Sequence, residues 1–275
     1  MFAFRLLPFC CVNAQSSIMS SSYQILNEMK SLLRKQLIVS AIWMLSATSL
    51  VAQEVTVFAA SSLRDALGTV AAEYERETGV KVVMVFAASS AVARQVAQGA
   101  PADVVLLADE EWGAWLVDQG VVEQVEAFIG NRLVLIGKGI DPVSQADLAT
   151  LLDGQLIAMA QTDAVPAGRY GQAALLSLGL WDRFEPHVVQ AANVRAALRF
   201  VERGEVLFAI GYASDLVALP ELSEIYSFAP DSHPMIVYSG ADLTPQGENF
   251  MAYLQSVTAQ NILGDWGFAP LLDTP

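Results

Sequence analysis

Short apolar runs alternate along this chain with stretches in which apolar residues recur at helical spacing, and this alternation strongly limits the possible folds. VTVFA at 55–59, for example, precedes a stretch in which Leu63, Leu67 and Val70 share one helical face. We predict strands at 55–59, 81–87, 102–108, 131–137, 155–160, 187–191, 206–212, 224–229 and 235–241. Helices are expected between them, including 144–152, 166–178 and 194–202. The pattern indicates an α/β fold whose mostly parallel or mixed sheets are flanked by helices.

The size and charge of the chain restrict its partners. Its 275 residues, 54% of them hydrophobic, are enough for one large domain or two small ones. The formal net charge is −14; residues 1–53 hold four basic residues and one acidic residue, so the remainder carries −17. Such a surface repels nucleic acid and anionic membranes. An anion site here must therefore depend on local donors.

Cysteine and histidine are scarce, which excludes several kinds of chemistry. The two cysteines, Cys10 and Cys11, are adjacent and close to the N-terminus, so the rest of the chain has no thiol for a disulfide framework or a zinc cluster. The only histidines are His187 and His233. A metal centre built from side chains, or an enzyme that needs histidine or cysteine, is poorly supplied. We expect a protein without a cofactor and without catalytic activity.

Residues 1–53 have the features of a secretory signal, with a natural start at Met29. An apolar run of 16 residues at 37–52 follows a basic segment and ends in small residues. The flanking residues are Lys30, Arg34 and Lys35 before the run, and Ala47, Ser49 and Ala52 within its end. A membrane anchor is the alternative, but a spanning helix needs about 20 apolar residues. We therefore predict export to the periplasm with cleavage between Ser49 and Glu54.

Four expected corners between a strand and a helix carry small or capping residues. They are Ser61-Ser62, Ser89-Ser90, Pro166-Ala167-Gly168 and Asn193-Val194. The first N–H groups of a helix have no partner within the helix and bind anions readily. In open α/β sheets such corners gather at the carboxyl ends of the strands, where ligands bind. Ordinary helix capping explains any one corner alone, so an anion site requires the corners to act together.

Six motifs in order resemble those of the periplasmic molybdate-binding proteins, which serve molybdate ABC transporters. The motifs are VFAASSLRDAL, FAASSAVARQVAQGAPADV, DAVPAGRYGQAAL, ANVRAALRFVERGE, IGYASD and PDSH. The similarity extends from about Val55 to Phe268. GAPADV and VPAGxY are specific in combination, so chance similarity is a poor explanation.

This resemblance implies a set of ligand-binding residues. Two serine hydroxyls, two backbone amides and one tyrosine hydroxyl would hold the oxyanion: Ser62, Ser89, Ala167, Val194 and Tyr212. Ser61 and Ser90 are fallback assignments, because VFAASS occurs twice in the chain. All five groups are neutral donors, which suits molybdate or tungstate because these ions present only acceptors. The metal would be bound only as its oxyanion, with no direct ligation by side chains.

The resemblance also implies two lobes with the ligand in the cleft between them. One lobe would comprise residues 54–133 plus 236–275 and the other 134–235, with crossovers near 131–137 and 233–239. Closure around the ligand would be of the hinge type. The expected partners are the small oxyanion and the membrane permease of an ABC transporter, and the protein itself would be a monomer.

Three other functions compete with this hypothesis. The first is a binding protein for another tetrahedral oxyanion, such as sulfate or phosphate. The second is an exported hydrolase that uses Ser62 or Ser89, which would require His187 or His233 nearby in space. The third is an effector domain of a DNA-binding regulator, against which the signal and the acidic surface argue.

Four arginines lie close to the corners and need a separate interpretation. Direct contact with an oxyanion is possible for each, but we expect them on helix surfaces or in pairs with carboxylates. They are Arg64, Arg94, Arg169 and Arg195.

Overall fold

The computed structural model describes residues 28–30, 32–36 and 53–271, and the chain divides into the units Met1–Val51 and Ala52–Pro275. In the first unit, residues 28–30 and 32–36 are helical and exposed; the apolar run at 37–52 of the predicted signal lies outside the described residues. Within the described part, no helix has the length and apolar character of a membrane span.

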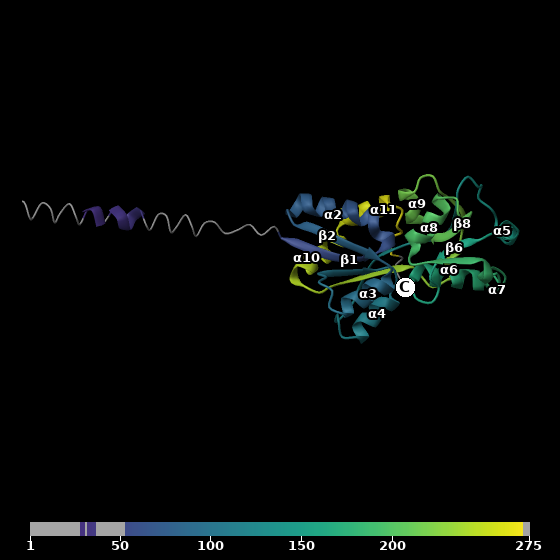
Figure 1. Cartoon of the computed structure of the whole chain (residues 1–275), viewed down its shortest axis with the longest axis horizontal. Coiled ribbons are helices and arrows are strands. Elements are labelled where there is room, and N and C mark those ends of the chain that lie inside the picture. Colours follow the sequence, from purple (N-terminus) through teal and green to yellow (C-terminus); the bar gives the residue numbers. More distant parts are fainter. Residues whose placement is uncertain (1–27, 31, 37–52, 272–275) are drawn as a thin grey trace, which may run out of the picture. The chain divides into compact units, whose positions relative to one another are not determined.

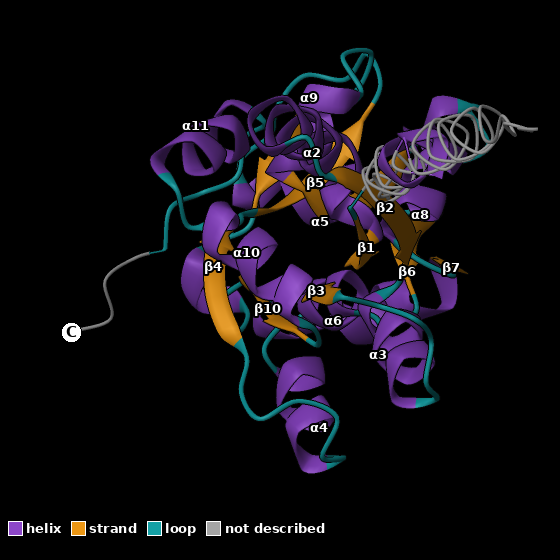
Figure 2. Cartoon of the chain, turned by 90° about the vertical axis from the view of Figure 1, so that its left-hand side faces the viewer, coloured by secondary structure: helices purple, strands orange, loops and turns teal. Residues whose placement is uncertain are grey.

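The first of two five-stranded sheets in the second unit has the strand order β2-β1-β3-β10-β4. Figure 1 labels β1 and β2 of this sheet, and Figure 2 labels all of its strands. Its strands are β1 (Glu54–Ala60), β2 (Lys81–Ala87), β3 (Val104–Leu107), β4 (Glu126–Gly130) and β10 (Val237–Asp242). All four residues of β3 are buried, as expected for a strand covered on both faces. Successive side chains point to opposite faces of the sheet, so Val104 and Val105 pack in different clusters of the core.

Helices cover both faces of this first sheet. One face packs against α3 (Ser89–Ala97) and α4 (Glu111–Asp118), whose Val92 and Leu116 are fully buried with Phe58 and Val105. The helices α2 (Arg64–Thr78) and α11 (Val257–Asp265) lie on the other face (Figure 2). The helix α10 (Pro245–Leu254) packs against α2 through the edge-to-face contact of Phe250 with Tyr74.

The second sheet has the order β7-β6-β8-β5-β9. Its strands are β5 (Leu133–Gly137), β6 (Ile157–Ala160), β7 (Val188–Ala191), β8 (Phe208–Tyr212) and β9 (Ser223–Ser227). Its helices are α5 (Gln145–Leu151), α6 (Pro166–Ser177), α7 (Trp181–Phe184), α8 (Val194–Glu202) and α9 (Ala213–Ala218). The short 3-10 turns are η1 (Ser61–Leu63), η2 (Glu185–His187) and η3 (Pro230–Ser232). Each sheet contains two parallel pairs and two antiparallel pairs, so the predicted α/β class with mixed sheets is confirmed.

The chain passes from one sheet to the other twice. The first passage lies between Gly130, the end of β4, and Leu133, the start of β5. The second lies between Ser227, the end of β9, and Val237, the start of β10. Leu133, which the sequence analysis assigned to the first lobe, pairs with Tyr212 in the second sheet.

Candidate functional site

One small pocket lies where strands of both sheets end, and all five residues singled out from the sequence line it. Its cavity volume is about 10 Å³. Its lining residues end or follow β1, β2 and β3 of the first sheet and β6, β7 and β8 of the second. They are Ala60, Ser61, Ser62, Ala88, Ser89, Ala108, Val165, Pro166, Ala167, Val194 and Tyr212. The structure therefore brings the four corners together, as an anion site would require.

The two serine corners come from the two VFAASS copies, which pair out of step by one residue. The copies are 28 positions apart in the sequence, but β1 and β2 pair at an offset of 27, with Ala60 opposite Ala87. Equivalent letters of the two copies therefore do not lie opposite each other. This offset explains how Ser62, the second serine of its copy, and Ser89, the first of its copy, line the same pocket. Ser61 also lines the pocket.

Both proposed serine ligands are buried and already hydrogen-bonded. Ser62 and Ser89 are 3% and 1% exposed. The Ser89 hydroxyl oxygen accepts a hydrogen bond from the backbone N–H of Ala108 at 2.9 Å. The Ser62 hydroxyl lies 2.8 Å from the hydroxyl of Tyr238, a residue of β10. These contacts hold the two side chains in place before any ligand arrives.

The two backbone amides lie in the first turns of helices α6 and α8. Ala167 is the second residue of α6, and Val194 is the first residue of α8. N–H groups at these positions lack intrahelical partners and are available to an anion. The side chain of Asn193 caps α8 by accepting from the N–H of Ala196 at 3.0 Å, which leaves the N–H of Val194 free of that cap. A helix start of this kind carries partial positive charge.

The close packing around Gly168 explains why the VPAG motif ends in glycine. A Cβ atom at this position would lie 2.3 Å from the backbone oxygen of Gln161 and 2.4 Å from that of Ala160. Only glycine therefore allows the first turn of α6 to approach the end of β6 so closely. This approach positions the neighbouring amide of Ala167 at the pocket.

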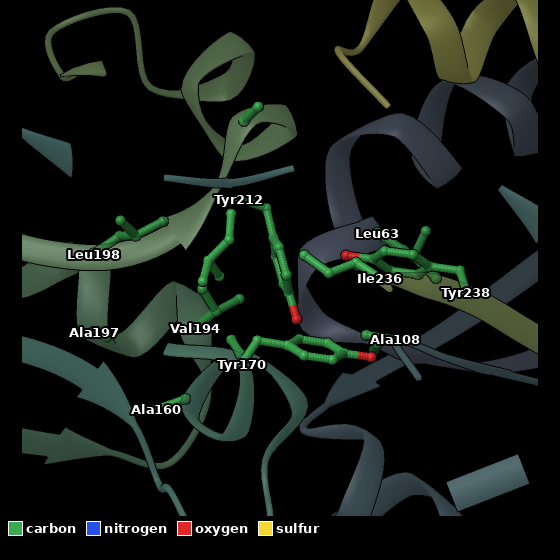
Figure 3. Packing of buried hydrophobic residues seen from close by; sticks show 14 of the residues in the cluster. Leu63, Ala108, Ala160, Tyr170, Val194, Ala197, Leu198, Tyr212, Ile236 and Tyr238 are labelled. Atoms are coloured by element: carbon green, nitrogen blue, oxygen red, sulfur yellow. The ribbon is translucent and has the colours of Figure 1, made fainter. Parts of the chain in front are cut away.

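Tyr212, the last residue of β8, contributes a hydroxyl that has no hydrogen-bond partner among the described residues. The side chain is 1% exposed, and Figure 3 shows its hydroxyl directed toward Tyr170 and Ala108. Burial, aided by neighbours including Tyr238 and Asp109, raises the pKa of Tyr212 well above its usual value. The hydroxyl therefore keeps its proton at neutral pH. An unpartnered buried hydroxyl is costly, and a ligand acceptor would satisfy it.

The four arginines near the corners have partners that do not line the pocket. Arg195 forms ion pairs with Asp65 at 2.7 Å and with Asp215 at 2.9 Å. Arg169 lies 2.5 Å from Glu111 and 3.9 Å from Asp109. The remaining two stack on aromatic rings: Arg64 on Phe86 and Arg94 on Trp112. Within residues 53–271, the wall of the pocket thus contains neutral groups and no basic side chain.

One acidic side chain lies directly beside the pocket. Asp109 follows the lining residue Ala108 and is 4% exposed. Burial raises the pKa of its carboxyl to about 6, against the opposing effects of the Trp112 N–H and of Arg169. The sequence analysis did not single out Asp109, Tyr238 or Asn131. The segment 235–241 predicted only a strand, and nothing local marked its tyrosine as a partner of Ser62.

The two serines have no histidine partner of the kind that a hydrolase needs. Their hydroxyls bond to Tyr238 and to the backbone of Ala108. His233 instead contacts the backbone oxygen of Pro234 through its Nδ1 at 2.8 Å. In the segments that the structure describes, no group of three or more His, Cys, Asp or Glu residues could hold a metal ion.

Comparisons with known proteins agree with this arrangement. Residues 55–269 match the family model of bacterial extracellular solute-binding proteins. The chain is 36% identical to the molybdate-binding protein ModA of Escherichia coli over 229 residues, which cover 78% of this chain and 88% of the relative. ModA of Haemophilus influenzae is 35% identical over 229 residues, covering 78% and 90%. The periplasmic molybdate-binding protein of Azotobacter vinelandii has the same fold, with a TM-score of 0.71, 21% identity and coverage of 79% and 100%.

The fold and the pocket between two sheets are those of a solute-binding protein, a class that binds its ligand without chemical conversion. Within this class, the chain belongs to the ModA family of bacterial extracellular solute-binding proteins. The prediction of a non-enzymatic protein is confirmed by this membership.

Proposed function

We propose that the protein captures molybdate or tungstate in the pocket and delivers the oxyanion to the membrane permease of an ABC transporter. One observation supports this most: five neutral donors, contributed by both sheets, surround a single pocket. The donors are the hydroxyls of Ser62, Ser89 and Tyr212 and the amides of Ala167 and Val194. The ModA relatives are molybdate-binding proteins, which points to the same ligand class.

Neutral donors suit a fully ionised oxyanion. A molybdate dianion offers only acceptor oxygens, so each donor of the pocket finds a partner. A buried anion without a counter-charge needs several good hydrogen bonds to offset its desolvation. The Tyr212 hydroxyl, which lacks a partner among the described residues, supports this proposal because the ligand would supply one.

The ligand would also join two lobes. We assign residues 54–133 plus 236–275 to one lobe and 134–235 to the other, with the passages at 130–133 and 227–237 as the hinge. Ser62 and Ser89 then belong to the first lobe, and the other three ligand residues belong to the second. Binding would favour the closed arrangement because only there do both sets of donors reach one anion.

The cellular setting follows from the same proposal. Residues 1–53 would direct the chain to the periplasm and be removed, and the product would act as a monomer that binds no nucleic acid. The formal charge of −17 that remains after residue 53 supports the last point. Mass spectrometry of the exported protein tests the cleavage: an intact 37–52 segment contradicts it.

Calorimetry of the purified protein against molybdate, tungstate, sulfate and phosphate tests the function. We expect one site per chain, occupied tightly by molybdate and tungstate and far more weakly by the other two anions. Sulfate is also a proton-free tetrahedral acceptor, so cavity size has to distinguish it. Tightest binding of sulfate would replace the molybdate proposal with a sulfate one, and no binding of any of the four anions would refute both.

A further inference from the structure

A chain of buried hydrogen bonds runs from the pocket serine Ser62 to the passages between the sheets. The Ser62 hydroxyl contacts the Tyr238 hydroxyl at 2.8 Å. The side-chain nitrogen of Asn131 lies 3.4 Å from the same Tyr238 hydroxyl and 2.8 Å from the Ser214 hydroxyl. Asn131 lies in the passage between β4 and β5, and Ser214 lies in α9, two residues after Tyr212. All four side chains are at most 9% exposed.

The backbone determines the direction of these bonds at Asn131. The N–H of Arg132 donates to the side-chain oxygen of Asn131 at 2.9 Å. A backbone N–H can only donate, so this contact identifies the oxygen end of the amide. The opposite end, the NH₂ group, therefore faces Ser214 and Tyr238 and donates to them.

The donor role of Asn131 then determines the direction of the hydrogen bond between Tyr238 and Ser62. A tyrosine hydroxyl has one hydrogen. Of its two side-chain contacts, Asn131 can only donate, so Ser62 is the partner that can accept this hydrogen. Burial raises the pKa of Tyr238 above its usual value, so the hydrogen remains in place at neutral pH. The Ser62 oxygen is thereby an acceptor for Tyr238. Its own single hydrogen is left for the pocket.

Ser89 shows the same arrangement with a backbone donor. The N–H of Ala108 donates to the Ser89 hydroxyl oxygen at 2.9 Å, which again leaves the serine hydrogen unused. For both proposed serine ligands, Ser62 and Ser89, a donor other than the ligand therefore occupies the hydroxyl oxygen and leaves the hydrogen for the anion. The Ala108 donor is part of the backbone, whereas the donor at Ser62 is a side chain that can be removed.

We propose that Tyr238 is a positioning residue that holds Ser62 as a donor and so sets the preference of the pocket for oxyanions without an O–H group. This inference rests on the proposed function. Molybdate, tungstate and sulfate carry no hydrogen at neutral pH and need only donors. Inorganic phosphate keeps at least one O–H throughout the neutral range and needs an acceptor in the site. A pocket in which Ser62 and Ser89 are both committed as donors offers that O–H no acceptor at either serine, and this disfavours phosphate.

The variant Tyr238→Phe removes the hydroxyl and keeps the ring, which packs against Phe128, Tyr212 and Phe268. Without the tyrosine donor, Ser62 can turn and accept from a phosphate O–H. We expect the ratio of the molybdate affinity to the phosphate affinity to fall at least about tenfold, and the ratio of molybdate to sulfate to stay within about twofold. Dissociation constants from calorimetry and competition at one pH provide both ratios.

Two further variants separate positioning from a merely structural role. Tyr253→Phe is the matched control, because it also removes only a tyrosine hydroxyl and Tyr253 lies on α10, outside the pocket lining; both ratios should remain those of the wild type. In a Ser62→Ala background, Tyr238→Phe should have no further effect on the ratios, because Tyr238 acts through Ser62. Should Tyr238→Phe fail to fold, Asn131→Asp serves in its place. Its carboxylate accepts from Tyr238, so Tyr238 in turn accepts from Ser62 and the direction of the hydrogen bonds is reversed. The ratio of the molybdate affinity to the phosphate affinity should fall in the same way.

The outcomes distinguish this inference from the proposed function. Suppose that the wild type binds molybdate and that Tyr238→Phe weakens the binding of molybdate, phosphate and sulfate equally, or leaves it unchanged. Tyr238 then does not set the preference, and the inference fails while the proposed function stands. A ratio change of equal size in Tyr253→Phe, or one that persists fully without the Ser62 hydroxyl, also overturns it. Absence of anion binding in the wild type refutes the proposed function itself.

Discussion

The guanidinium of Arg195 lies 2.7 Å from the carboxylate of Asp65, and this ion pair joins α8, which follows a strand of the second sheet, to α2, which follows a strand of the first. Arg195 also contacts the fully buried Asp215 at 2.9 Å, whose other oxygen accepts from the backbone N–H of Tyr212. The pair therefore lies beside two proposed ligand residues, Val194 and Tyr212. It connects the two halves of the pocket in the arrangement seen here.

Asp65→Asn should speed the release of molybdate, because the variant removes one partner of the connection between the two sheets. The Asp65 side chain is 33% exposed, so the loss is that of a partly solvated pair, about 0.2–1 kcal/mol. This corresponds to a dissociation constant raised by up to about fivefold, with little change in thermal stability. Stopped-flow fluorescence gives the rate of release, and calorimetry gives the affinity.

The exposed pair between Arg76 and Glu73 supplies the control, since both residues lie on α2 and on one side of the pocket. Glu73→Gln should leave the release rate unchanged. Equal rates for Asp65→Asn and the wild type would show that the Arg195–Asp65 pair does not stabilise the closed arrangement.

Asp109→Asn should change how stability depends on pH. The folded-state pKa of Asp109 is raised to about 6 by burial, from an ordinary value of 3.8, so the folded protein holds this proton more tightly than the unfolded chain. The stability of the wild type therefore falls as pH rises from about 4 to about 6, and the cost persists above that range. Asparagine cannot ionise and keeps an acceptor for the N–H of Trp112. The difference in the free energy of unfolding, variant minus wild type, should be ~2 kcal/mol larger at pH 8 than at pH 4.

Thermal or denaturant unfolding of both proteins between pH 4 and 8 measures this difference. Asp215 also has a raised pKa of about 6, because of burial, but it is common to both proteins and cancels in the comparison. A stability difference that stays constant over the pH range would mean that Asp109 titrates normally in the folded state.

Much of the fold could be predicted because several of its strands are contiguous apolar runs buried on both faces. Val104–Leu107 and Leu133–Gly137 are examples in which every residue is buried. The strand Glu126–Gly130 was missed, because it lies at the edge of its sheet and has two exposed residues at its start. The short helices Trp181–Phe184 and Ala213–Ala218 were also missed, since four to six residues are too few to show a helical period.

The site was predictable only in part. Local sequence indicated the corners, because small and capping residues follow buried strands, but the choice of Ser62 over Ser61 came from a family resemblance. The physical basis of that choice is the offset between β1 and β2, which depends on pairing and not on local pattern. The contact between Ser62 and Tyr238 spans 176 positions and joins a predicted corner to a predicted strand. No periodicity within either segment could show it.

Tyr212→Phe and Ser89→Ala should each weaken molybdate binding while leaving the fold intact. Each removes a single buried donor to a charged ligand, which costs about 1–3 kcal/mol, or roughly a five- to 150-fold loss of affinity. Arg94→Ala is the comparison: Arg94 stacks on Trp112 at 5.0 Å from the ring centre and should change the affinity little. Calorimetric titration of the three variants decides the matter. Lost binding in Arg94→Ala with unchanged binding in the other two would indicate a site based on charge pairing.

Trp112 should report closure of the pocket through its fluorescence. Its indole N–H donates to the backbone oxygen of Ala164 at 2.8 Å, and Arg169 lies 5.8 Å from its ring centre. Trp112 belongs to α4, which packs on the first sheet. Ala164 lies between β6 and α6 of the second sheet, and Arg169 lies in α6. Opening of the two halves would break this hydrogen bond and hydrate the indole. We therefore expect molybdate to change the emission of the wild type.

The variant Trp112→Phe should lose most of that change and bind molybdate up to about tenfold more weakly, as expected for a neutral hydrogen bond worth roughly 0.5–1.5 kcal/mol. Trp266→Phe is the matched control, because the Trp266 indole donates to Thr69 at 3.0 Å between α11 and α2, on the same side of the pocket. Its ligand response should equal that of the wild type. If Trp266→Phe abolishes the response and Trp112→Phe preserves it, the contact between Trp112 and Ala164 is not broken and remade during ligand binding.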